Sequence, residues 1–188
     1  DLSERAFSSI EQDLFMIRQD ALNSVKLDPF FKRYINTNFN LIPLIHGKER
    51  KVYILTAPQN NGHVIFGNDY LLTYDKNNML VGKKQLHQNI IPVEYGDTTD
   101  SEKRVVGTIH SHTVETGDFI TATDICTLML YEKQAGWETH HVASKKYLNI
   151  WNCQKDELTV ISMKVIDKIN KDQKNHGEDK NPEDSSPN

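Results

Sequence analysis

Two histidines and one aspartate form the clearest chemical pattern in this chain. His110 and His112 stand two residues apart at the end of the β-branched run V-V-G-T-I-H-S-H, and Asp124 opens an apolar helical pattern further on. Side chains two apart on a strand point to the same side, so both imidazoles are expected on one face. Three protein ligands leave one tetrahedral position for water, which is typical of catalytic rather than structural zinc. The sequence therefore predicts a Zn²⁺ site held by these three residues.

The same stretch resembles the motif of the JAMM/MPN (JAB-like) zinc metalloproteases. That motif is His-x-His, seven residues and then Ser-x-x-Asp, and it follows a catalytic glutamate far upstream. The matching residues are G-T-I-H-S-H at 107–112 and T-A-T-D at 121–124, followed by an amphipathic helix. The chain departs from the motif in two ways: eight residues separate His112 from Thr121, and threonine stands in place of serine. The order of strands and helices extends the resemblance over roughly residues 44–163.

The resemblance implies a zinc-dependent metallopeptidase or isopeptidase. In the family, a metal-activated water attacks the amide bond, a glutamate carries its proton to the leaving amine, and a serine hydroxyl supports the oxyanion. Thr121 would take the role of that serine. The pattern Thr121-x-x-Asp124 ahead of an apolar run is also a helix-capping signal, and both interpretations can hold together. The implied partner is a peptide or protein substrate.

The general base is harder to identify. Glu49 matches the family's position best, because the family places its base before or within the first strand, yet G-K-E-R-K is also typical of an exposed turn. Glu115, Glu94 and Asp69 are the other candidates. Two functions therefore stay open. The chain is a JAMM-type amide hydrolase, or it is a catalytically inactive JAMM-like domain with a protein-binding or structural role.

The other histidines give no comparable signal. His140 and His141 are adjacent, so their side chains would point to opposite faces of a strand, and a surface pair is the simplest interpretation. The remaining histidines have no partner at ligand spacing: His46, His63, His87 and His176.

Composition narrows the class of protein. The net charge of −4 over 188 residues gives no basic footprint for nucleic acid. The sequence contains no apolar run as long as a membrane span. Two cysteines, Cys126 and Cys153, do not make a disulfide framework, although one bridge between them is possible. Because the chain begins at Asp1 rather than Met, a removed or trimmed N-terminal segment is expected, and an exported protein fits this.

Periodicity predicts the elements that position these residues. Apolar residues at three- and four-residue steps predict a long N-terminal helix from Ser3 to Lys26, packed on the domain's own sheet, and residues 30–34 suggest a second short helical piece. From Val52 onward the period is two. Strands are expected at 52–55, 63–74 and 79–91, with a turn at 75–78 and a polar flap at 95–103.

After the metal motif, the pattern predicts a helix at 124–135 that ends at Gly136, and then strands at 139–143, 147–152 and 158–163. From Lys168 the polar composition predicts a disordered tail. This order predicts an α+β fold, a mixed β-sheet with flanking helices. The resemblance implies JAMM/MPN-like, cytidine-deaminase-like layering. We expect a helical segment at 1–43, a JAMM/MPN-like domain at 44–166 and the tail at 167–188.

Overall fold

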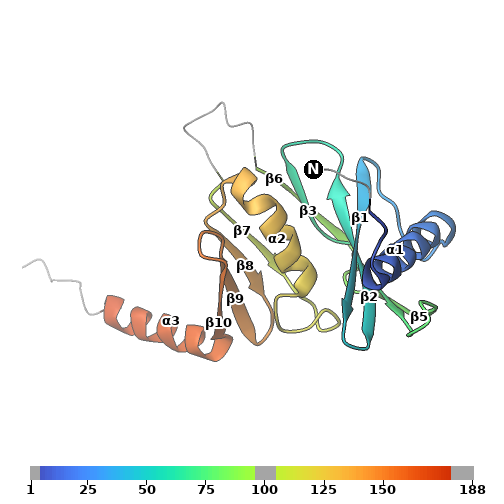
Figure 1. Ribbon diagram of the computed structural model, residues 1–188. Coiled ribbons are helices and arrows are strands. Elements are labelled where there is room, and N and C mark those ends of the chain that lie inside the picture. The colour runs from blue at the N-terminus through green and yellow to red at the C-terminus, as the bar shows by residue number, and fades with distance from the viewer. Residues whose placement is uncertain (1–4, 96–104, 179–188) are drawn as a thin grey trace, which may run out of the picture.

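Helices and strands form an α+β arrangement in the computed structural model, which describes residues 5–95 and 105–178 (Figure 1). The α+β class predicted from the sequence is confirmed. The helices in this part of the chain are α1 (Ser9–Leu27), α2 (Ala122–Ala135) and α3 (Met163–Glu178). The strands are β1 (Thr37–His46), β2 (Glu49–Pro58), β3 (His63–Gly67), β4 (Tyr70–Tyr74), β5 (Leu80–Gln85), β6 (Ile90–Glu94), β7 (Gly107–Ser111), β8 (Thr139–Ala143), β9 (Tyr147–Asn152) and β10 (Glu157–Ser162).

The first core lies between α1 and an antiparallel sheet with strand order β1-β2-β4-β5. Ile17, Ala21 and Val25 form the buried stripe of α1, as expected for an amphipathic helix that covers a sheet. The helix begins at Ser9 and not at Ser3, because Ser8 and Glu11 form a capping box that ends the extended backbone before it. Residue 3 itself lies outside the described residues.

The second core surrounds α2. One face of α2 packs with the sheet of order β10-β9-β8-β7 and with β3, which pairs with β6 in a two-stranded sheet. Strands β7 and β8 are parallel neighbours, and α2 is the crossover that connects them. The end of β7 and the start of α2 are therefore joined by one loop at the same edge of the sheet. This arrangement positions the metal motif.

The strand expected at 63–74, with a bulge or kink at Gly67-Asn68, is interrupted at that step. The stretch forms β3 and β4, which belong to different sheets, and Asn68 between them has a φ of +49°. A left-handed residue cannot continue a strand, so the chain turns here from one sheet into the other. The stretch at 79–91 divides in the same way into β5 and β6.

Two further expectations near the N-terminus are corrected. Residues 30–34 form a turn and irregular backbone rather than a helix, although Phe31 is buried in the first core. The boundary expected at residue 43 falls inside β1, which pairs with β2 along its whole length. Pro43 is tolerated because β1 is the edge strand of its sheet, where a missing N–H costs no ladder bond on the open side.

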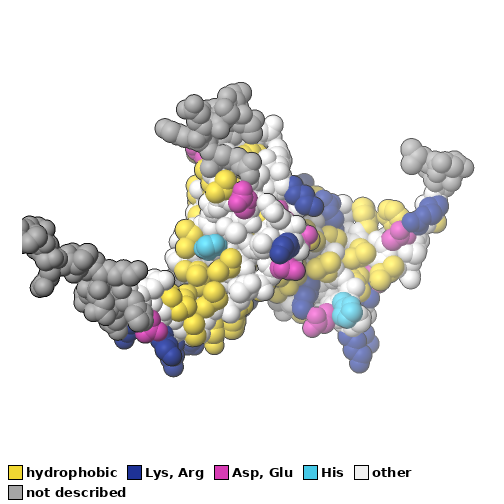
Figure 2. Space-filling view, turned by 90° about the vertical axis from the view of Figure 1, so that its left-hand side faces the viewer, with side chains coloured by type: hydrophobic (Ala, Val, Ile, Leu, Met, Phe, Trp, Pro, Cys, Tyr) yellow, Lys and Arg dark blue, Asp and Glu magenta, His cyan; other side chains and the backbone are white. Residues whose placement is uncertain are grey.

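The C-terminal segment is helical where disorder was expected. Helix α3 runs to Glu178 and extends away from the sheets (Figure 1), and its apolar Val165 and Ile169 are each about half exposed. Apolar side chains also gather on the surface beside α3 (Figure 2). Proline is absent from this segment, so its Lys, Asp and Gln residues are compatible with a helix. Residues 179–188 and the expected flap beyond Tyr95 lie outside the described residues.

Neither cysteine is bridged. Cys126 is half-buried on α2, and Cys153 is buried after β9. Burial, reinforced by the neighbouring Glu132, raises the pKa of Cys153 to about 12, which makes this thiol unreactive. Among the described helices, none has the length and apolar character needed to cross a membrane.

We expect Asn68→Ala to destabilise the protein strongly. The Asn68 amide donates to Lys32 O and Thr56 Oγ1, and its carbonyl accepts from the Tyr70 hydroxyl, all at 2.8–3.0 Å. Alanine would lose these buried bonds and disfavour the positive φ, so the free energy of unfolding should fall by about 2 to 4 kcal/mol. Urea denaturation measures this, with the exposed Asn60→Ala as the control. Equal stability of the two variants would contradict the role given to Asn68.

Candidate metal centre

The predicted ligands meet at the junction of β7 and α2. His110 lies on β7, His112 follows it directly, and Asp124 lies in the first turn of α2. The His112 N–H donates to Ala143 O at 2.8 Å, so the parallel pairing with β8 continues one residue beyond β7. This extended backbone turns both imidazoles toward α2, as the His-x-His spacing predicted. All three side chains are buried.

Four possible ligand atoms of these three residues, two imidazole nitrogens and two carboxylate oxygens, lie close together. His110 Nε2 lies 3.2 Å from His112 Nε2 and 3.7 Å from Asp124 Oδ1, and His112 Nε2 lies 3.3 Å from Asp124 Oδ2. Four tetrahedral ligands at about 2.0–2.1 Å from zinc are separated from one another by about 3.3 Å. The donor set and its spacing therefore fit zinc.

Thr121 orients Asp124 from the N-terminus of α2. The Thr121 N–H and hydroxyl both donate to Asp124 Oδ2, at 2.9 and 2.6 Å, within a capping box. Burial opposes ionisation of Asp124. The hydrogen bond with His112, the nearby charges of His110 and His87 and the bond from Thr121 outweigh this, so they hold the carboxyl's pKa well below its usual range. The Thr121 hydroxyl is thus hydrogen-bonded to the carboxylate of a predicted metal ligand. Its expected role in supporting the oxyanion stays a prediction.

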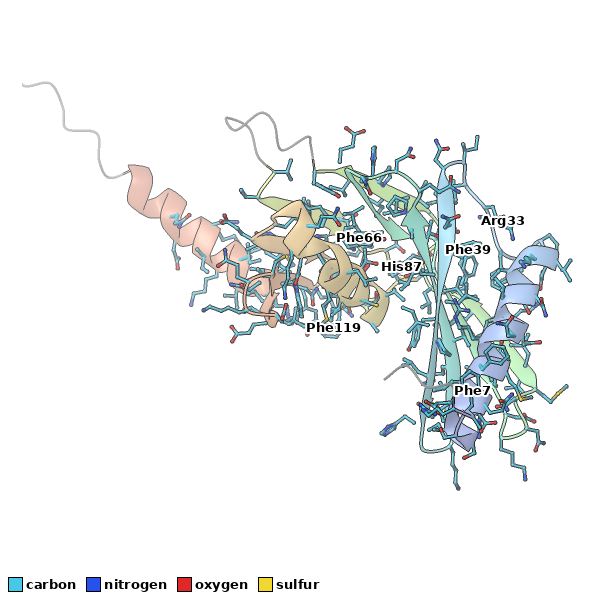
Figure 3. All side chains as sticks on the ribbon, turned by 45° about the horizontal axis from the view of Figure 1, so that its top comes forward. Phe7, Arg33, Phe39, Phe66, His87 and Phe119 are labelled. Atoms are coloured by element: carbon cyan, nitrogen blue, oxygen red, sulfur yellow. The ribbon has the colours of Figure 1, made fainter. Side chains whose placement is uncertain are left out.

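A buried chain of polar groups supports His110 from behind. His140 Nε2 lies 3.1 Å from His110 Nδ1, and Thr108 Oγ1 lies 2.6 Å from His140 Nδ1. If His110 Nε2 keeps its lone pair for a metal, His110 Nδ1–H donates to His140, and His140 Nδ1–H donates to Thr108. Phe66 stacks on His140 at a centroid distance of 4.7 Å (Phe66 labelled in Figure 3). The expectation that His140 and His141 form a surface pair is wrong for His140, which is 1 % exposed.

Both histidines of this hydrogen-bonded chain, His110 and His140, are held neutral. Burial lowers the pKa of His110 to about 4 and that of His140 to about 3, in each case with a contribution from neighbouring histidines. Metal ligation needs the neutral imidazole, so the environment already favours the ligating form of His110.

A second histidine–aspartate pair, which spacing did not predict, completes the cluster. His87 lies in the loop between β5 and β6, next to α2 (Figure 3), and its Nδ1 is 2.7 Å from Asp69 Oδ1. Burial lowers the pKa of His87, but the hydrogen bond and charge of Asp69, together with Asp124, raise it above its usual value. His87, His112 and Asp124 each offer a ligand atom within 4.8 Å of the others.

Glu49, the favoured base, is not at this site. Its side chain is 66 % exposed and pairs with Lys51 at 2.7 Å, at the end of β2 that faces the hairpin with β1. Asp69 directly precedes Tyr70, which pairs with Ile54. At about 3.3 Å per residue, the stretch of β2 from Glu49 to Ile54 spans roughly 16 Å, which removes Glu49 from the pair Asp69–His87.

The other candidate bases lie in different settings. Glu94 is 80 % exposed and faces His63 at the far end of the β3–β6 pair. Glu115 is exposed and accepts a hydrogen bond from the Thr113 hydroxyl at 2.7 Å. Asp69 is the one named alternative that the fold buries and connects to the cluster.

Two pockets adjoin the centre, and the loop 113–118 lines part of each. One of about 200 Å³ is lined by His87 and by polar residues that include Gln85, Asn89, Ser111 and Glu115. The other, of about 260 Å³, is lined by His112, Val114, Asp118, Lys145 and Lys146. Each pocket therefore includes one histidine of the cluster.

Comparison of the chain with models of known protein families, with curated proteins and with solved structures finds no match.

We expect acid to destabilise the metal-free protein. Because His110 and His140 have folded pKa values of about 4 and 3, below the ordinary 6.5, the unfolded chain takes up more protons as the pH falls below 6.5. Their stabilising effect is full above pH 6.5 and declines as the pH approaches those folded values. Each should account for a loss of about 2 kcal/mol between pH 6.5 and 5.

Urea denaturation at pH 7 and pH 5 measures this loss in the wild type and in His140→Phe, which keeps a ring against Phe66. The raised pKa of His87 acts in the opposite direction in both proteins, so the difference between them reports His140. An unchanged acid sensitivity in His140→Phe would show that His140 is not the titrating group.

Proposed function

We propose that this chain is a zinc-dependent hydrolase of peptide, isopeptide or related amide bonds, of the JAMM type. The observation that supports this best is the spacing of 3.2–3.7 Å between the Nε2 atoms of His110 and His112 and between each of them and one carboxylate oxygen of Asp124. The proposal includes the family's layering, with the motif carried by the unit β7–α2–β8.

Two of the three ligands are in the state that a divalent metal needs. His110 is neutral, and the lowered pKa of Asp124 keeps its carboxylate ionised. Such a donor set, with two imidazoles and one carboxylate, suits zinc. When bound, zinc would act as a Lewis acid and supply a water with a pKa near neutrality.

The surrounding residues hold this donor set and limit access to it. Thr121 orients Asp124, and Thr108 and His140 orient His110, which leaves little freedom for either ligand. Phe66 forms an apolar wall against His110, at a centroid distance of 5.4 Å. Water therefore reaches the centre mainly from the pockets that contain His87 and His112.

The two pockets favour an extended substrate. They share Thr113, and the loop that connects β7 to α2 lines both. A substrate that crosses this loop beside the centre can place groups in both, which a peptide chain does and a small compact amide does not. Glu115 on one side and Lys145 on the other would contact groups of opposite charge.

A JAMM-like domain without catalysis is the second candidate function. The exposure of Glu49 favours it, because the family's carboxylate base is then missing from its expected place. The two candidates share the same metal site and differ in hydrolysis, so metal content alone does not separate them.

We expect purified protein to bind about one zinc per chain and to cleave a peptide or isopeptide library in a chelator-sensitive way. His112→Ala removes a ligand, and Asp124→Asn removes the anionic one, so each should lower both zinc affinity and cleavage by about a hundredfold or more, beyond the usual cost of an outer-shell change. Elemental analysis and mass spectrometry of the cleaved library measure the two effects.

His63→Ala is the matched control, because His63 lies on β3 and faces Glu94 rather than the centre. Protein that binds no zinc would refute the metal site. Zinc-loaded protein that cleaves nothing across the library would refute the hydrolase and favour the non-catalytic domain.

A further inference from the structure

We propose that His87 is a fourth protein ligand of the metal, with Asp69 as the carboxylate that orients it. The proposal deepens the proposed function, because it concerns how the same site is closed and opened. It rests on the metal site of that function but not on hydrolysis.

The geometry places His87 beside the predicted triad. A ligand atom of His87 lies within 4.8 Å of those of His112 and Asp124, and the rings of His87 and His112 are 5.2 Å apart. His112 and Asp124 also belong to the predicted triad, so the two groups describe one centre. Among the described residues, His87 Nε2 is buried without a hydrogen-bond partner. A buried ring nitrogen without a partner is costly unless it binds something.

Asp69 gives His87 the setting of a metal ligand. A ligating histidine usually donates its other N–H to a carboxylate, which fixes the tautomer and the ring orientation. Asp69 accepts this bond at His87 Nδ1 at 2.7 Å, which leaves Nε2 with its lone pair when the ring is neutral. The backbone reinforces the contact, because the Leu86 N–H donates to Asp69 O at 2.9 Å.

The buried hinge at Asn68 fixes Asp69 in turn. Asn68 is fully buried and bonded on both sides of its amide, so the residue after it has little freedom. Asp69 is itself 2 % exposed. A buried carboxylate needs a partner, and His87 is the partner that the structure provides. The Asp69–His87 pair is thus held in place by contacts between residues that are far apart in the sequence.

His87 can both close and open the centre. The ligand atoms of His87, His112 and Asp124 lie within 4.8 Å of one another, and tetrahedral zinc ligands are about 3.3 Å apart, so a shift of at most on the order of 1 Å brings His87 to ligand distance. The loop 86–89 lies between two strands and lines the pocket of about 200 Å³. With His87 bound, four protein ligands fill the site, which is the closed pattern. A group that enters this pocket and displaces His87 would expose the metal position that a reacting water needs.

Metal binding tests the proposal without reference to hydrolysis. Zinc affinity is measured by competition with a chromophoric chelator, and visible absorption of the Co²⁺-loaded protein reports coordination geometry. The variants are His87→Ala, His87→Phe, which keeps the ring but has no ligand nitrogen, and Asp69→Asn. His63→Ala and Glu94→Gln are matched controls, because these residues face each other away from the centre. Circular dichroism confirms that each variant is folded.

Both His87 variants should bind zinc at least about tenfold more weakly, and Asp69→Asn should lose about tenfold as an outer-shell change. The Co²⁺ absorption of both His87 variants should shift, because a water replaces an imidazole ligand. The controls should match the wild type.

Wild-type zinc affinity and an unchanged Co²⁺ spectrum in both His87 variants would overturn the proposal. If those variants lose affinity while zinc-loaded wild type cleaves nothing, the proposed ligand stands and the hydrolase fails. If they keep wild-type affinity while the wild type cleaves, the hydrolase stands and His87 is not a ligand.

Discussion

The parallel crossover from β7 through α2 to β8 is the constraint on which the centre depends. It brings the end of β7 to the start of α2, so His110 and His112 meet Asp124 across one loop. The capping box of α2 then serves two purposes, because the Thr121 groups that start the helix also bind Asp124 Oδ2. A carboxylate in the first turn is also favoured by the helix dipole. Local helix stability and ligand orientation therefore come from the same few hydrogen bonds.

A second constraint acts from the other side of the cluster. The positive φ of Asn68 directs the chain from the β3–β6 pair into the sheet β1-β2-β4-β5. This turn places Asp69 beside His87, which itself follows β5 in the same sheet. The two cores of the molecule thus each contribute to the centre. His110, His112 and Asp124 belong to the half around α2, and Asp69 and His87 come from the connections of the other half.

The sequence predicted the candidate site residues that lie close together in the chain. It did not predict those that approach from distant parts of the chain. A two-residue spacing on a strand and a carboxylate at a helix start lie within fifteen residues, and period and capping rules describe such distances. His87, Asp69 and His140 approach through strand order and register, which no spacing encodes. Glu49 lies away from the cluster for the same reason. Its position in the sequence does not indicate which end of β2 reaches the cluster. The one available signal for Asp69 was the Gly67-Asn68 step, which indicated a bend but not its direction.

Stability alone does not explain this cluster. Four histidines and two aspartates are buried or nearly so within hydrogen-bonding or ring contact of one another, and an apolar core of the same volume would avoid the cost of removing them from water. His110 Nε2 and His112 Nε2 face each other at 3.2 Å, so at most one of them can carry a proton there without a clash between two N–H groups. When both rings carry their proton on Nδ1, the two Nε2 lone pairs repel each other, and a cation between them, with Asp124 to balance its charge, would satisfy both. The arrangement that is costly for an apoprotein is the one that a bound metal makes favourable.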